Sequence, residues 1–279
     1  MKTSGSAISQ GNRPSAIPPV RPAAFFGLTL LLSWLIWIPL ALSHFGIGPF
    51  HIAEEISAII RLLGILMPSA AALWLTARGG GRAAVRGLLG RLAHWRVGWR
   101  WWLAAVVVVP ALLIASGLLY NRLGGQPPVT PPPPVAPVAL ATNIVFLALA
   151  TLGEEIGWRG VALPTLQQRR SALASSVILG LVWAAWHIPF WLLLDTFDQF
   201  GVGYLALNLL LGFPMTVYIT WFFNHSQASL LLPVAFHLSF NLVNVVWLPV
   251  TTNIGAFVLS IAALWVVALL ILPRLESQP

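Results

Sequence analysis

Cysteine is absent from this sequence, and charged residues make up only 8% of it. The missing cysteine excludes disulfide bonds, thiolate nucleophiles and zinc sites built on cysteine, and it leaves the redox compartment open. Acids are especially rare, with seven Asp and Glu in 279 residues, whereas 58% of the chain is hydrophobic. A composition so poor in charge and so rich in apolar residues is typical of a membrane protein.

Apolar runs of about 18 to 22 residues recur along the chain. About 20 apolar residues cross a hydrocarbon core of roughly 30 Å as a helix. The sequence therefore predicts an all-α polytopic membrane protein with about eight transmembrane helices. The expected spans are 24–43, 56–77, 101–120, 138–163, 172–194, 203–223, 228–248 and 254–273.

Basic residues gather in the loops on one side of the predicted bundle. Twelve of the fifteen Lys and Arg lie on that side, Arg122 lies in a loop on the other, and Arg61 and Arg159 lie within spans. Because basic loops favour the cytoplasmic side, both termini are expected to be cytoplasmic, in a multi-pass protein of the cell membrane. These loops also account for the net charge of +8, so no nucleic-acid partner is expected.

The chain is expected to form one membrane domain behind a short tail. Residues 1–22 are polar and rich in Ser, Pro and Gly, which predicts a disordered cytoplasmic tail. Residues 23–275 should form the transmembrane helical domain, since no linker is long enough to separate two domains. The basic, partly apolar segment from Arg82 to Trp99 is a candidate amphipathic helix along the inner membrane surface.

A short set of polar side chains lies inside the predicted spans. Ionisable groups in hydrocarbon are costly and usually mark function, although asparagines often serve as contacts between helices. The set consists of Glu154, Glu155 and Arg159 on the fourth span, His187 on the fifth, Asn208 on the sixth, and His237 and Asn241 on the seventh.

The fourth span carries two adjacent acids and an arginine. Glu155 and Arg159 stand at i and i+4 with the acid first, which favours a helical ion pair. Glu154 points about 100° away from Glu155, so the two carboxylates need not share one environment. A pair of acids in different environments is what acid/base catalysis requires.

The ionisable residues on three spans lie at similar depths. At 1.5 Å per residue, Glu154 is about 14 Å, His187 about 20 Å and His237 about 14 Å from the cytoplasmic end of its span. Antiparallel neighbours could therefore present all three to one buried polar pocket. A lone intramembrane histidine is as often a packing residue as a functional one, so the shared depth carries the interpretation.

Three motifs follow one another within about 90 residues: Glu154-Glu155-x-x-x-Arg159-Gly160, an aromatic-x-x-x-His element from Trp183 to His187, and His-x-x-x-Asn from His237 to Asn241. Together they resemble the CAAX protease and bacteriocin-processing family, which includes the type II CAAX prenyl endopeptidases. The second motif of that family most often begins with phenylalanine, where this chain has tryptophan. The resemblance covers roughly 136–250 in detail, and this region is the expected protease-like core.

The resemblance implies an intramembrane endopeptidase acting on membrane-associated or lipidated peptides. Glu154 would be the general base that activates a water, with help from His187. Glu155 and Arg159 would shape and hold the site. The expected partners are such a peptide or protein substrate and the lipid bilayer, and no oligomeric state is predicted.

The same resemblance implies that His237 and Asn241 stabilise the oxyanion of the tetrahedral intermediate. No cofactor is expected, because Glu154 and Glu155 are adjacent rather than set in a His-Glu-x-x-His motif. Two histidines and a glutamate are nevertheless also a zinc ligand set, so the alternative is a zinc site of Glu154, His187 and His237.

Two functions of other classes stay open on the residues alone. A non-catalytic membrane scaffold or immunity protein could use the same fold to bind other membrane proteins. A proton-coupled transporter would also need buried acids and histidines. The absence of a visible internal repeat argues against the transporter.

Overall fold

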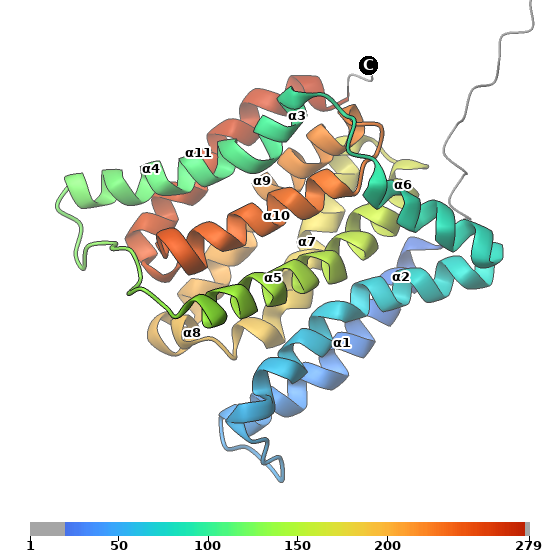
Figure 1. Ribbon diagram of the computed structural model, residues 1–279. Helices are drawn as coiled ribbons and strands as arrows, with labels where there is room; N and C mark the ends of the chain where they lie inside the picture. Colours follow the sequence, from blue (N-terminus) through green and yellow to red (C-terminus); the bar gives the residue numbers. More distant parts are fainter. Residues whose placement is uncertain (1–19, 277–279) are drawn as a thin grey trace, which may run out of the picture.

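A computed structural model of the chain describes residues 20–276, and these residues form helices and no strand. Seven helices in this part of the chain are long and apolar enough to span a membrane. The fold is therefore an all-α polytopic membrane protein, as the composition predicts (Figure 1). The α-helices are α1 (Pro22–His44), α2 (Glu54–Gly90), α3 (Trp99–Leu103), α4 (Val109–Arg122), α5 (Pro137–Gly157), α6 (Leu163–Gln167), α7 (Ala172–Trp191), α8 (Asp195–Phe200), α9 (Val202–His225), α10 (Leu231–Leu242) and α11 (Ile254–Leu275).

Short turns of other helical types join or extend several of these helices. The π-helical turns connect α3 to α4, connect α5 to α6 and extend α10, and 3₁₀ turns follow α2 and precede α11. The π turns are Ala104–Val108, Trp158–Ala162 and Val243–Trp247, and the 3₁₀ turns are Arg91–Ala93 and Val250–Thr252.

The seventh expected span is shorter than the other seven. Leu231–Trp247 forms an apolar helix below the length of the full spans. Residues 228–230, which hydropathy assigns to this span, belong to a turn that is bonded to the segment after α2. The Leu230 amide donates to the Arg91 carbonyl at 3.1 Å, and the Ser229 hydroxyl donates to the His94 carbonyl at 2.6 Å.

Helix α2 runs well beyond the span 56–77 that hydropathy predicts. It bends at Gly81, whose φ of 63° and ψ of −161° suit glycine and few other residues. The first half of the predicted surface helix, residues 82–90, is thus the end of α2. Leu88 on this part is buried at 1% exposure, so the segment packs on the bundle as well as facing outward.

Helix α5 packs against α2 on one side and α10 on another, while α7 packs against α9 and α9 against α11 (Figure 1). Glycine allows α5 to approach α2 closely, because a Cβ at Gly157 would lie 2.6 Å from the Pro68 carbonyl carbon. The Ser69 hydroxyl also donates to the Leu152 carbonyl at 3.0 Å. The end of α5 is therefore held firmly against α2.

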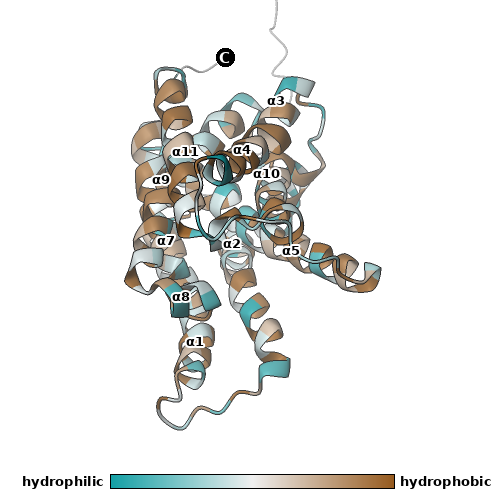
Figure 2. Cartoon of the chain, turned by 90° about the vertical axis from the view of Figure 1, so that its left-hand side faces the viewer, coloured by the Kyte–Doolittle hydropathy of each residue, from teal (hydrophilic) through white to brown (hydrophobic). Residues whose placement is uncertain are grey.

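Both ends of the described chain lie at the same end of the bundle (Figures 1 and 2). The Glu276 carboxylate accepts the Ala172 and Leu173 amides at the start of α7. The Phe25 ring, near the start of α1, meets the Trp158 ring at 5.5 Å. This arrangement agrees with an even number of crossings. The tail expected at 1–22 falls almost wholly outside the described residues.

Hydrophobic residues dominate the helices, and hydrophilic residues gather mainly at helix ends and loops (Figure 2). Large apolar side chains such as Leu35 and Leu270 are 63% and 67% exposed. Lipid tails cover such faces at no hydrophobic cost, so the pattern is that of a bilayer-embedded bundle.

Candidate active site

The two glutamates lie at the end of α5, where the helix passes into the π turn Trp158–Ala162. Every residue from Gly153 to Leu163 is buried. A π turn widens the helix locally and often occurs at functional sites. Here it follows directly after the acids and carries Arg159, so the fourth span is irregular at the point where its charges are.

Glu155 is the centre of a fully buried ion pair. Its Oε1 accepts from Nη1 of Arg159 at 2.9 Å, and their side chains are 0% and 1% exposed. The ion pair predicted from the i, i+4 spacing is therefore confirmed. The same Oε1 lies 2.9 Å from Nδ1 of His237. Because this oxygen is the acceptor for an arginine, we assign the proton to Nδ1, and Nε2 of His237 is left for another partner.

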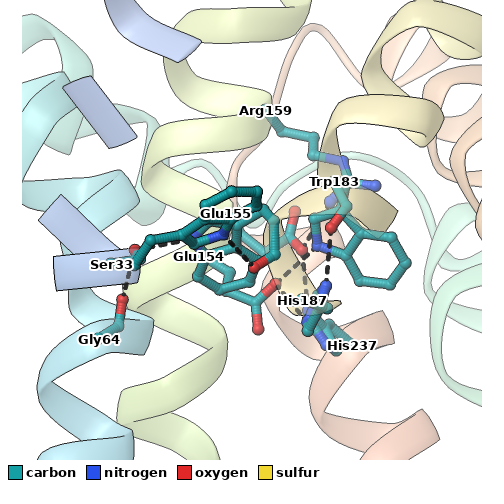
Figure 3. A network of polar contacts seen from close by, with 10 residues as sticks. Ser33, Gly64, Glu154, Glu155, Arg159, Trp183, His187 and His237 are labelled. Atoms are coloured by element: carbon teal, nitrogen blue, oxygen red, sulfur yellow. Dashed lines mark hydrogen bonds and ion pairs between the residues drawn. The ribbon is translucent and has the colours of Figure 1, made fainter. Parts of the chain in front are cut away.

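Glu154 has different neighbours from Glu155. Its Oε2 accepts the indole N–H of Trp183 at 2.7 Å, and the residue is 5% exposed. Oε2 also lies 3.9 Å from Nε2 of His187, which is too far for a direct hydrogen bond. The two carboxylates thus occupy separate environments, since Glu155 is ion-paired and Glu154 is bonded to a neutral indole N–H (Figure 3).

His187 is fixed by its own helix and by aromatic rings. Its Nδ1 lies 2.8 Å from the Trp183 carbonyl, and since a carbonyl only accepts, Nδ1 carries the proton. Nε2 therefore presents a lone pair toward Glu154. The ring stacks on Trp191 at 5.1 Å and meets the edge of Trp186 at 4.4 Å, which leaves it little freedom to rotate.

A chain of hydrogen bonds joins helix α7, which carries His187, to helices α1 and α2. The Trp186 indole donates to the Ser33 hydroxyl at 2.6 Å, and Ser33 donates to the Gly64 carbonyl at 2.8 Å (Figure 3). The Trp34 indole donates to the Trp186 carbonyl at 3.1 Å. Helix α1 thereby ties α7 to α2, and the histidine of α7 is set against the acids of α5.

The structure brings together five of the six residues that the motifs suggest, namely Glu154, Glu155, Arg159, His187 and His237. Asn241 is half-buried on the helix of His237, and its side chain makes no hydrogen bond within the described residues. Asn208 is buried and donates to the Tyr204 carbonyl one turn earlier, at 2.8 Å. Asn208 is thus satisfied within its own helix.

The sequence assigns no role to the tryptophan that contacts Glu154. Trp183 stands four residues before His187, so both lie on one face of α7. This spacing, together with the shared depth of the fourth and fifth spans, is the signal that could have suggested the contact.

The zinc alternative requires three side chains grouped as ligands of one ion. Within the described chain, no three His, Asp or Glu side chains form a group that could hold a metal ion. We therefore derive no step through a metal.

Known proteins resemble this region of the chain. Residues 136–243 match the family described as Type II CAAX prenyl endopeptidase Rce1-like. Over 105 residues the chain is 35% identical to CAAX prenyl protease 2 of Methanococcus maripaludis, an alignment that covers 36% of this chain and 38% of that protein. The chain thus aligns with well under half of that relative's length. The resemblance that the three motifs predict is confirmed for this region, which contains all of them.

Proposed function

We propose that the chain is an intramembrane endopeptidase that cleaves membrane-associated or lipidated peptides with a water activated by Glu154. The likeness of residues 136–243 to type II CAAX prenyl endopeptidases supports the reaction class. The name of the Methanococcus relative, a prenyl protease, supports a substrate that carries a lipid. The buried acids and imidazoles supply the groups that such a hydrolysis needs.

One observation carries the proposal, the 3.9 Å gap between Oε2 of Glu154 and Nε2 of His187. A water that donates to both atoms over about 2.8 Å would span this gap with an angle of roughly 90° at its oxygen. Both of its hydrogens would then be held by bases, and a lone pair would point away from them. A water in that state is positioned to attack a carbonyl carbon.

The hydrolysis follows from these positions. The water oxygen bonds to the scissile carbonyl carbon while Glu154 takes one water proton. The carbonyl oxygen becomes an oxyanion, which Nε2–H of a doubly protonated His237 and the amide of Asn241 stabilise. Collapse of the intermediate breaks the C–N bond, and Glu154 returns its proton to the leaving nitrogen. The products are a carboxylic acid and an amine.

Glu155 and Arg159 act on this chemistry through His237. The Glu155 carboxylate holds Nδ1 of His237 and so aims its other nitrogen. Arg159 balances the charge of Glu155, because a lone carboxylate at 0% exposure would be strongly destabilised. With Arg159 and a protonated His237, the two carboxylates form a site without net charge.

Cleavage by purified protein tests the proposal. The protein is reconstituted in lipid bilayers and offered peptides with a C-terminal lipid or a membrane anchor. Glu154→Ala and His237→Ala should each lower the rate by about 10² to 10⁴. The matched control is Glu54→Ala, whose side chain is 82% exposed at the far end of α2. Cleavage that survives both changes would overturn the assignment of the reaction to this site, whereas a wild type that cleaves no such peptide would leave the scaffold or transporter functions as the better accounts.

The metal-free character is tested separately. We propose that active protein contains no stoichiometric metal and that a chelator leaves its rate unchanged. Elemental analysis of an active preparation, paired with chelation, measures both. One zinc per chain together with loss of activity on chelation would overturn this part of the proposal.

We also propose that the chain lies in the cell membrane with both termini in the cytoplasm. The basic residues on one side of the bundle support this orientation. Because the chain has no cysteine, single cysteines can be labelled against a clean background. An impermeant thiol reagent on intact cells should label Leu123→Cys and not Ser277→Cys, and the reverse pattern would invert the orientation.

A further inference from the structure

Trp183 touches both groups that hold the proposed water. Its indole N–H donates to Oε2 of Glu154 at 2.7 Å, and its backbone carbonyl accepts Nδ1–H of His187 at 2.8 Å. Its ring meets the ring edges of His187 at 4.6 Å and His237 at 6.2 Å. One residue therefore contacts the base and both imidazoles (Figure 3).

The indole is the hydrogen-bond donor that reaches Glu154 in the described chain. Arg159 and His237 both donate to the neighbouring carboxylate of Glu155 instead. Without the indole, Oε2 of Glu154 would have no donor among the described side chains, and the carboxylate could turn about its last torsion. A hydrogen bond to an ionised group is short and directional, so it fixes that torsion well.

The carbonyl contact fixes the second group. A proton on Nδ1 of His187 leaves the lone pair at Nε2, on the side that faces Glu154. This contact comes from the helical spacing of residues 183 and 187, and any residue at 183 would provide it. The side-chain contact to Glu154, in contrast, requires a donor at the tip of a large ring.

We infer that Trp183 is a positioning residue for the hydrolysis, whose indole N–H orients the Glu154 carboxylate toward the water shared with His187. This inference rests on the proposed function and adds a residue to it. Trp183 does not touch the reacting atoms, and it acts through Glu154. The donor matters more than the bulk of the ring, which sets the design of the test.

Two replacements separate the donor from the ring. Trp183→Phe removes the N–H and part of the ring, whereas replacing Trp183 by 3-benzothienylalanine removes the N–H and keeps the bicyclic shape. Both should lower kcat about 10- to 100-fold and leave KM within about twofold, because a charge-assisted hydrogen bond is lost while substrate contacts stay. Trp265→Phe is the control, since its indole donates to the Leu210 carbonyl outside the site.

Each outcome decides the question. Wild-type kcat in both variants would overturn the inference. A loss with phenylalanine but not with benzothienylalanine would also overturn it, because ring packing would then be the cause. A loss of kcat in both, with wild-type behaviour of the control, is the expected result.

A spectroscopic measurement separates this inference from the proposed function. Ultraviolet resonance Raman reports the hydrogen bond of an indole N–H, and the signal of Trp183 is isolated as the difference from Trp183→Phe. Glu154→Ala should weaken that hydrogen bond. An unshifted signal with an active wild type would overturn this inference alone, and an inactive wild type would overturn the proposed function and the inference with it.

Discussion

Removal of Arg159 tests whether the buried ion pair stabilises the fold. The change Arg159→Met keeps a long apolar side chain and deletes the charge that lies 2.9 Å from Glu155. The Glu155 carboxylate, at 0% exposure, would then face His237 alone. The same carboxylate also has an oxygen, Oε2, that already lacks a partner within the described chain. The variant thus leaves a buried charge with one donor.

The size of the effect follows from that burial. Breaking a buried ion pair by removing one partner costs about 3 to 5 kcal/mol. For a chain of this size such a loss lowers the melting temperature by on the order of 10 °C. Thermal unfolding in detergent, followed by tryptophan fluorescence, measures the shift. Removing both charges in Glu155→Met/Arg159→Met should restore much of the stability, because no unpaired charge remains.

The matched control is a second ion pair of different burial. Arg61 meets Glu54 at 3.4 Å, but the Glu54 side chain is 82% exposed. Such pairs contribute about 0 to 1 kcal/mol, so Arg61→Met should unfold within a few degrees of the wild type. An Arg159→Met protein that melts at the wild-type temperature, or a double variant as unstable as the single one, would show that the buried pair does not hold the fold in this way.

Three further predictions concern packing, pH and the oxyanion. Gly157→Ala should lower the free energy of unfolding by about 1 to 3 kcal/mol, since its Cβ would lie 2.6 Å from the backbone of α2. The control is Gly27→Ala, whose Cβ would meet nothing within 4 Å. Equal melting temperatures of the two variants would contradict the close packing. The backbone amide of Leu173 lowers the pKa of Glu276. The Glu276 carboxylate therefore contributes stability above the ordinary glutamate pKa, and this contribution is lost as pH falls through its lowered pKa. Glu276→Gln should flatten the plot of melting temperature against pH in that range. Asn241→Ala should lower kcat about 10²- to 10³-fold with an unchanged melting temperature, and unchanged kcat would remove Asn241 from the site.

Local spacing and hydropathy predict much of this fold and site. The apolar runs predict the spans because the bilayer sets helix length. The Glu155–Arg159 pair follows from i, i+4 spacing, and the proximity of Glu154 to His187 follows from their similar depth. Each of these features depends either on spacing within one helix or on depth in the bilayer, and both can be counted along the sequence.

Other features depend on contacts between segments and could not be read this way. A turn replaces the expected first residues of the seventh span, because Ser229 and Leu230 donate hydrogen bonds to the segment after α2. The extension of α2 past Gly81 depends on the packing of Leu88 against the π turn that follows α5. A Cβ added at Gly160 in this turn would lie 2.9 Å from the Leu88 side chain. The bond from Trp183 to Glu154 needs the rotation of two helices about their axes, which hydropathy does not specify.

The most direct test of the central claim is the rate of peptide cleavage by Glu154→Gln. Glutamine keeps the size of the side chain and an oxygen for the Trp183 indole, but it cannot take a proton from water. We expect a rate about 10³-fold below the wild type, with the same melting temperature. Cleavage by Glu154→Gln at the wild-type rate would contradict this expectation.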